Sequence, residues 1–160
     1  MLHIKLLCVG KLKEKYFASA AAEYIKRLGG YARVEVEELP EVHLPAQPSE
    51  AEIAAALERE GESIRLRVPK DALVVAMCVE GRQLSSEQLS EFVQLCAVKG
   101  KNRLCFIIGG SMGLAESVKN EAALKLSMSG MTFPHHLARI MLLEQLYRAF
   151  KIAEGGKYHK

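Results

Sequence analysis

The segment from residue 104 to residue 150 constrains the fold of this 160-residue chain most strongly. An apolar run over residues 104–108, rich in residues that favour β-strands, ends at the sequence Gly-Gly-Ser-Met-Gly of residues 109–113. A short polar stretch leads to a second run over residues 123–127, which is followed by a loop containing Gly130 and by a long apolar pattern. We therefore predict the order strand, glycine loop, short helix, strand, loop, helix.

The two loops of this segment are predicted to lie at one end of a sheet. Each loop follows a strand, and we expect these two strands to be neighbours. In open α/β sheets, ligands bind in the crevice outside the carboxyl ends of the strands. The pattern therefore predicts a binding site formed by residues 109–113 and 128–136.

The rest of the chain alternates strands and helices in the same way. Strands are predicted at residues 2–9, 33–39 and 71–79, and a turn is predicted at residues 80–82. Helices are predicted at residues 13–28 and after the capping residues Ser49 and Ser85. This alternation predicts an α/β fold with a mostly parallel five- to six-stranded sheet and helices on both faces. The length indicates a single domain over residues 1–160.

Charge and hydropathy leave most functional classes open. The net charge of +3 permits a nucleic-acid partner without requiring one. The N-terminus lacks the basic and apolar regions of a signal peptide, and no apolar run approaches the roughly 18–20 residues of a membrane span. We therefore expect a cytoplasmic protein that does not cross a membrane.

The four cysteines form no C-x-x-C pair, and three of them lie in apolar, strand-like runs. Such residues are typical of buried, reduced thiols. A zinc site would need Cys and His ligands clustered at short spacing, and the sequence has none. We expect no metal.

The last predicted helix, residues 134–153, is apolar over more than one stripe of its surface. A helix of this kind is buried on more than one side. A second copy of the chain would provide the additional cover, so the pattern predicts a homodimer through the C-terminal helix.

The glycine loop by itself allows several interpretations. It does not match the dinucleotide fingerprint G-x-G-x-x-G, and no carboxylate follows at the end of the next strand. A Walker loop would need Gly-Lys-Ser/Thr, which is also missing. NAD and ATP are therefore disfavoured, and a plain tight turn without a ligand stays open.

Polar residues near the C-terminus are also open to two interpretations. His135 could act in catalysis or serve only in capping or core hydrogen bonds. Glu144 and Arg148 are spaced to form an ion pair on one helix face, which would stabilise the helix slightly. The tail with Tyr158 and His159 could be a frayed terminus or an arm that becomes ordered on RNA, where aromatic rings stack on bases.

Together these motifs resemble the bacterial RlmH family of SPOUT-class methyltransferases, which act on N3 of a pseudouridine in 23S rRNA. The resemblance spans the whole chain and keeps the order of the motifs. It is carried by residues 9–13 (VGKLK), 81–87 (GRQLSSE), 106–114 (FIIGGSMGL), 126–135 (LSMSGMTFPH), Arg139, 144–149 (EQLYRA) and Tyr158-His159.

The resemblance implies a fold and a cofactor that periodicity alone does not. The C-terminal part would form a trefoil knot, and S-adenosyl-L-methionine would bind in it, held by the backbone of three loops, with Met131 and Phe133 beside the adenine. By motif, the implied cofactor-binding residues are Met77, Gly109, Gly110, Gly113, Met128, Ser129, Gly130, Met131, Thr132 and Phe133.

The resemblance also implies the partners: a homodimer through the last helix, and a pseudouridine (position 1915) of 23S rRNA within the assembled 70S ribosome. The sulfonium is already an activated methyl donor, so the enzyme must align it with N3 and remove the N3 proton. His135 and His159 are candidate bases, Tyr158 would position the target base, and Arg139 or Arg148 would bind a phosphate or carbonyl.

Three other functions remain as alternatives. A non-catalytic RNA-binding or ribosome-associated dimer would not bind the cofactor. A small-molecule enzyme would use the glycine loop for a phosphate, which the missing lysine disfavours. A SPOUT enzyme acting on tRNA is disfavoured by the absence of an added RNA-binding domain.

Overall fold

The sheet contains five strands in the order β2-β1-β4-β3-β5, and every neighbouring pair is parallel. The computed structural model describes all 160 residues of the chain. The strands are β1 (Leu2–Val9), β2 (Ala32–Leu39), β3 (Leu73–Gln83), β4 (Arg103–Ile108) and β5 (Leu124–Ser127). The predicted parallel α/β sheet is confirmed.

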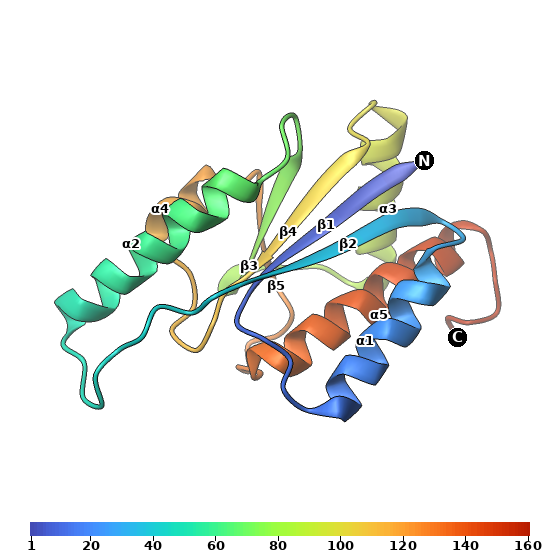
Figure 1. The fold of residues 1–160 in the computed structure, drawn as a ribbon. Coiled ribbons are helices and arrows are strands. Elements are labelled where there is room, and N and C mark those ends of the chain that lie inside the picture. The colour runs from blue at the N-terminus through green and yellow to red at the C-terminus, as the bar shows by residue number, and fades with distance from the viewer.

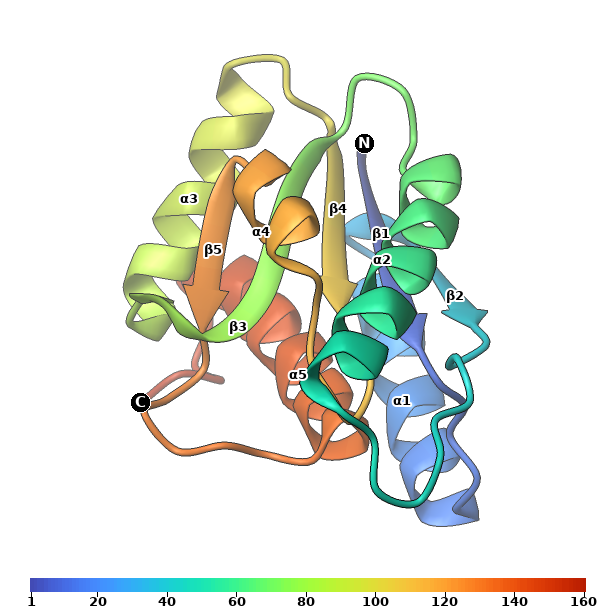
Figure 2. The same cartoon turned by 90° about the vertical axis from the view of Figure 1, so that its left-hand side faces the viewer.

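The helices cover both faces of this sheet, as predicted (Figure 1). One face carries α1, α3 and α5, and the other carries α2 and α4 (Figures 1 and 2). The helices are α1 (Lys15–Leu28), α2 (Glu50–Arg67), α3 (Ser86–Val98), α4 (Glu116–Glu121) and α5 (His135–Ala153). None of them is long and apolar enough to span a membrane.

Each face of the sheet has its own hydrophobic core. On one face Leu6 and Phe106 pack with Leu143 of α5, and on the other Ile107 packs with Ile64 of α2. Side chains alternate between the two faces of a strand, so a strand covered on both sides must be apolar at every position. This explains the continuous apolar run of β4.

Three of the four cysteines are buried in these cores, and none forms a disulfide. Burial raises the pKa of the Cys8 thiol to about 11 and that of the Cys105 thiol to about 12. Since the thiolate is the reactive form, these two side chains behave as apolar packing groups near neutral pH.

Both predicted capping boxes are present. The Ser49 hydroxyl accepts a hydrogen bond from the Glu52 amide, and the Glu52 carboxylate accepts one from the Ser49 amide. Ser85 and Gln88 form the same pair at the start of α3. These side chains satisfy amide groups that the first turn of a helix leaves free.

The turn predicted at residues 80–82 is wrong, because β3 continues to Gln83. Its register with β5 shifts between Met77 and Arg82, so β5 pairs with both parts of this long strand. A Cβ at Gly81 would lie only 2.7 Å from the backbone carbon of Lys125. Glycine is therefore needed where β3 and β5 approach each other, and it does not mark a turn.

The two loop-bearing strands, β4 and β5, are not neighbours as predicted, because β3 lies between them. Their C-terminal ends still lie at the same end of the sheet, since all strands are parallel (Figure 2). The end of β3 therefore stands between the two predicted loops and contributes to the site.

Candidate functional site

A cleft of about 750 Å³ lies at the C-terminal ends of β4 and β5 and beside residues 77–80 of β3. This volume is in the range of sites that bind small molecules of the size of a nucleoside cofactor. All of the predicted cofactor-binding residues line it except Gly130, so the structure brings together Met77, Gly109, Gly110, Gly113, Met128, Ser129, Met131, Thr132 and Phe133.

The glycine loop after β4 forms a tight turn. The Gly113 amide donates a hydrogen bond of 3.1 Å to the Gly110 carbonyl, and Gly113 has a φ of 82°. A Cβ at Gly109 would lie 2.5 Å from the carbonyl carbon of Gly113 and closer still to its oxygen. Only glycine can therefore occupy position 109, and the backbone itself forms this wall of the cleft.

The loop after β5 is shaped by its own serines. The Ser127 hydroxyl donates to the Ser129 carbonyl over 2.9 Å, and the Ser129 hydroxyl accepts from the Met131 amide over 3.1 Å. Met131 and Phe133 both line the cleft; Met131 is 73% exposed, while Phe133 is partly buried. The loop thus presents two large apolar side chains to a ligand.

His135 and His136, at the start of α5, also line the cleft. Their rings lie 3.9 Å apart between centroids. Burial and the neighbouring His136 lower the pKa of His135 below its usual value, although Glu41 opposes the change. His135 is therefore neutral near pH 7, and a neutral imidazole can accept a proton.

Four lining residues that the sequence did not indicate come from β3 and α4. The Lys119 ammonium lies 2.5 Å from the Glu80 carboxylate and 2.9 Å from Glu116. The turn that the sequence predicts at residues 80–82 excludes Glu80 from the site. In the structure β3 continues through these residues, and Glu80 lies along the cleft. These additional residues are Cys78, Val79, Glu80 and Lys119.

Arg139 does not reach the cleft. It is 2% exposed, and its guanidinium lies 2.6 Å from the Glu38 carboxylate and donates to the Gly10 carbonyl over 3.1 Å. Partial burial opposes ionisation of Glu38, but hydrogen bonds from Arg139 and the Leu12 amide outweigh it and lower the pKa of Glu38. Within one chain, Arg139 ties α5 to the ends of β1 and β2.

We expect Arg139→Met to lower the free energy of unfolding by about 3 kcal/mol, because removing one partner leaves the other charge poorly compensated. The pKa of Glu38 is lower in the folded protein than in the unfolded chain. The ionised Glu38 therefore stabilises the fold fully above its unfolded-state pKa, and this contribution is lost as the pH falls through its folded-state pKa. Urea titrations between pH 3 and pH 7 should therefore show a shallower decline for the variant. Arg67→Met is the control, since Arg67 is far more exposed than Arg139 and its partner Glu37 keeps a second cation, Lys5. Equal losses of unfolding free energy in Arg139→Met and Arg67→Met would contradict a structural role for Arg139.

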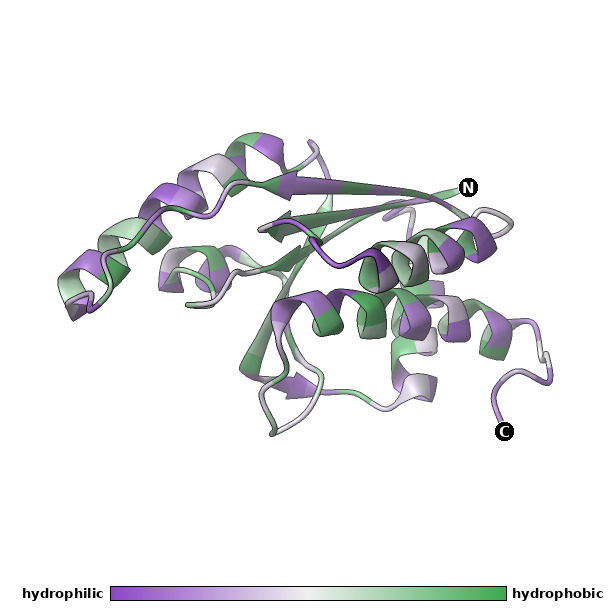
Figure 3. Cartoon of the chain, turned by 60° about the horizontal axis from the view of Figure 1, so that its bottom comes forward, coloured by the Kyte–Doolittle hydropathy of each residue, from purple (hydrophilic) through white to green (hydrophobic).

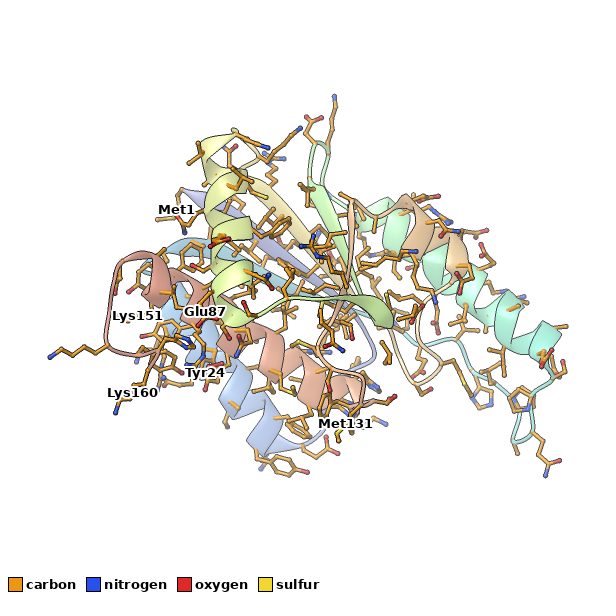
Figure 4. All side chains as sticks on the ribbon, turned by 180° about the vertical axis from the view of Figure 1, so that it is seen from behind. Met1, Tyr24, Glu87, Met131, Lys151 and Lys160 are labelled. Atoms are coloured by element: carbon orange, nitrogen blue, oxygen red, sulfur yellow. The ribbon has the colours of Figure 1, made fainter.

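The remaining predicted catalytic residues form a second cluster, at the C-terminal tail. The Tyr158 ring lies 4.7 Å from the Arg148 guanidinium, and the His159 ring contacts Arg148 at 3.1 Å and Glu87 at 2.7 Å. Glu144 forms the predicted ion pair with Arg148. None of Arg148, Tyr158 and His159 lines the cleft. Figure 4 shows the tail near Glu87, well separated from Met131.

The cleft is suited to an organic ligand. No group of three or more His, Cys, Asp or Glu side chains is arranged to hold a metal ion. The walls combine glycine backbone with thioether and aromatic side chains, which suit a flat heteroaromatic ring with polar edges. Backbone amide and carbonyl groups at three strand ends can supply the directional hydrogen bonds.

Solved structures with a similar fold include two bacterial proteins. A probable methyltransferase from Bordetella pertussis Tohama I superposes with a TM-score of 0.57 at 14% identity, covering 92% of this chain and 96% of that chain. A probable methylase family protein from Haemophilus influenzae Rd KW20 gives 0.55 at 16% identity, covering 95% of this chain and 66% of that one. At this identity, the likeness concerns the fold alone.

Sequence relatives are much closer. A protein from Bacillus cytotoxicus named ribosomal RNA large subunit methyltransferase H is 47% identical over 99% of this chain and its own full length. A protein of the same name from Pelotomaculum thermopropionicum is 46% identical over 99% of both chains. The family model described as "Predicted SPOUT methyltransferase" matches residues 2–159. The chain therefore belongs to the SPOUT methyltransferase family, in the group of ribosomal RNA large subunit methyltransferase H.

Proposed function

We propose that this protein transfers a methyl group from S-adenosyl-L-methionine to N3 of a pseudouridine in 23S rRNA of the assembled ribosome. The observation that carries the proposal is the single cleft that three strand ends build from the motifs of residues 109–113 and 128–133. The names of the relatives support a large-subunit rRNA substrate. Such a substrate also implies action in the cytoplasm.

The residues of the cleft fit S-adenosyl-L-methionine. Met131 and Phe133 offer apolar surface to an adenine ring, and no atom fills the place of a Cβ at Gly113, where a ligand can approach the backbone closely. When bound, the cofactor supplies an electrophilic methyl group. The protein's own task is to orient the ligand and the target base, because alignment of the two reacting groups provides much of the rate.

His135 is the base that we propose for the N3 proton. It lines the cleft, and its lowered pKa leaves the ring unprotonated near neutral pH and therefore available as a base. Its ring nitrogen Nε2 faces Gly10, where a Cβ would come within 3.3 Å. Glycine at position 10 therefore avoids a tight contact with this imidazole.

A homodimer through α5 is part of the proposal. Beside α5 lies a half-buried groove of about 500 Å³ with apolar walls, including Ile140, Met141 and Leu84. Ile140 and Met141 belong to the part of the apolar pattern of α5 that its own chain does not bury fully. A second copy of the helix would cover them.

The dimer also gives the tail a place in the reaction. Tyr158 and His159 lie against α3 and α5 of their own chain, apart from its cleft. The tail is largely hydrophilic (Figure 3) and lies beside the groove lined by Glu144. We infer that the tail of one subunit completes the cleft of the other, where Tyr158 can stack on the target base.

A direct test measures methyl transfer to ribosomes that lack the modification. We expect incorporation into 70S ribosomes and little into deproteinised 23S rRNA, because the net charge of +3 gives weak attraction for free RNA. Digestion to nucleosides and mass spectrometry should identify an N3-methylated pseudouridine. Transfer to tRNA instead, or no transfer by protein that binds the cofactor, would contradict the proposed substrate.

A further inference from the structure

The segment between β2 and α2 holds the glycine loop from outside the cleft. Glu41, two residues after β2, accepts two hydrogen bonds through one carboxylate oxygen. The donors are the Ser111 amide at 2.9 Å and the Ser111 hydroxyl at 2.5 Å. Ser111 lines the cleft and Glu41 does not, so the carboxylate contacts the loop from behind.

The fit between Glu41 and the loop is close. A Cβ at Gly110 would lie 2.7 Å from the carboxylate oxygen of Glu41 and 2.9 Å from its Cδ. Real Cβ atoms do not come within 3.0 Å of such neighbours. The φ of Gly110 is not in the left-handed region, so conformational freedom does not require glycine there. A methyl group at position 110 would therefore displace the Glu41 carboxylate, and it would also press against Cγ1 of Val9 at 3.2 Å.

The position of Glu41 is itself fixed by α2. The side chain of Glu60 is buried and accepts a hydrogen bond of 2.8 Å from the Val42 amide, next to Glu41 in the chain. Loops on a protein surface are usually mobile. Here a buried acceptor fixes the backbone beside Glu41, so the carboxylate stays where the glycine loop needs it.

Charge favours the same arrangement. Partial burial opposes ionisation of Glu41, but the two hydrogen bonds from Ser111 outweigh it and lower the pKa of Glu41. The side chain is therefore a carboxylate at neutral pH and can accept both bonds from Ser111 at once. Hydrogen bonds to a charged acceptor are stronger than those between neutral groups.

We propose that Glu41 is a positioning residue of the cofactor site, which holds residues 109–113 in the conformation that binds the ligand through its two hydrogen bonds to Ser111. The inference rests on the proposed function and adds to it a residue that does not touch the ligand. It also gives a reason for Gly110 that is distinct from the tight turn at Gly109.

The first test compares S-adenosyl-L-methionine binding by calorimetry. Glu41→Ala should weaken binding about tenfold, as expected for the loss of bonds to a charged group. The affinity of Glu41→Gln should lie between those of the unmodified protein and Glu41→Ala, because the amide oxygen of the glutamine can still accept a hydrogen bond. Glu62→Ala, which removes an exposed carboxylate of α2, is the matched control. Amide hydrogen exchange at Ser111 should speed up in Glu41→Ala while the urea midpoint stays unchanged.

The second test introduces Gly110→Ala into the unchanged protein and into Glu41→Ala, and again measures cofactor binding. In the unchanged protein the new methyl group displaces the flexible Glu41 carboxylate from Ser111 and should weaken cofactor binding about tenfold, as Glu41→Ala does. In the Glu41→Ala background the same substitution should have a smaller effect, because only the contact of 3.2 Å with Cγ1 of Val9 remains. Unaltered affinity and unaltered Ser111 exchange in Glu41→Ala would overturn the inference. Failure of the unmodified protein to bind would instead overturn the proposed function, and the role of Glu41 with it.

Discussion

Gly109→Val is expected to abolish measurable binding of S-adenosyl-L-methionine. The added Cβ would lie 2.5 Å from the backbone carbon of Gly113, so the turn that forms one wall of the cleft must open. Backbone cannot move aside as a flexible side chain can. We expect affinity to fall at least a hundredfold, which corresponds to about 2.8 kcal/mol of binding free energy. Calorimetric titration measures this loss.

The control for this variant is Gly30→Val, because no atom lies within 4 Å of a Cβ at Gly30 and its φ is not positive. It should bind like the unmodified protein. Gly109→Val should also lose about 1–3 kcal/mol of stability from overpacking, so circular dichroism must establish that it is folded at the assay temperature. Retained affinity in the folded variant would mean that the ligand binds elsewhere.

Replacement of Tyr158 and His159 together by alanine is expected to abolish methyl transfer to ribosomes while leaving cofactor binding intact. Neither side chain lines the cleft, so the binding of the cofactor does not depend on them. The target base, in contrast, would lose its stacking partner, and base stacking is worth about 1–3 kcal/mol. We expect turnover to fall at least a hundredfold, measured with labelled cofactor at saturation. Normal turnover would contradict a role for the tail.

A mixed dimer shows which cleft the tail serves. One chain would carry Gly109→Val and an intact tail, and the other an intact cleft with both tail residues replaced. If the tail acts on the cleft of its partner, this dimer contains one complete site and should show about half of the normal activity. If the tail folds into its own cleft, the mixed dimer should be inactive. The two homodimers, one of Gly109→Val chains and one of chains with both tail residues replaced, serve as the inactive references.

Local patterns predicted the elements of this fold well. The capping boxes at Ser49 and Ser85 and the strand over Leu2–Val9 depend on residues close together in sequence, and all of them are present. Much of the lining of the cleft followed from the glycine loop and the loop at Gly130, because parallel strands place their C-terminal ends together, but the contributions of β3 and Lys119 did not. Periodicity and turn chemistry carry this information.

Features that depend on distant pairing could not be predicted in this way. Gly81 indicated a turn, but the backbone of Lys125, more than forty residues away, requires glycine at that position in a continuous strand. Arg139 carries no local sign of its buried pair with Glu38. Glu41 lies among prolines in a loop, and nothing in its neighbourhood indicates a contact with Ser111. Each of these depends on long-range packing.

The most direct test of this account is calorimetric titration of the unmodified protein with S-adenosyl-L-methionine and, separately, with S-adenosylhomocysteine. We predict one site per chain with a dissociation constant in the micromolar range for both ligands, about −8 kcal/mol of binding free energy. Protein that is folded and dimeric yet binds neither ligand would contradict the assignment of the cleft to this cofactor. The result would then favour a non-catalytic protein that associates with ribosomes.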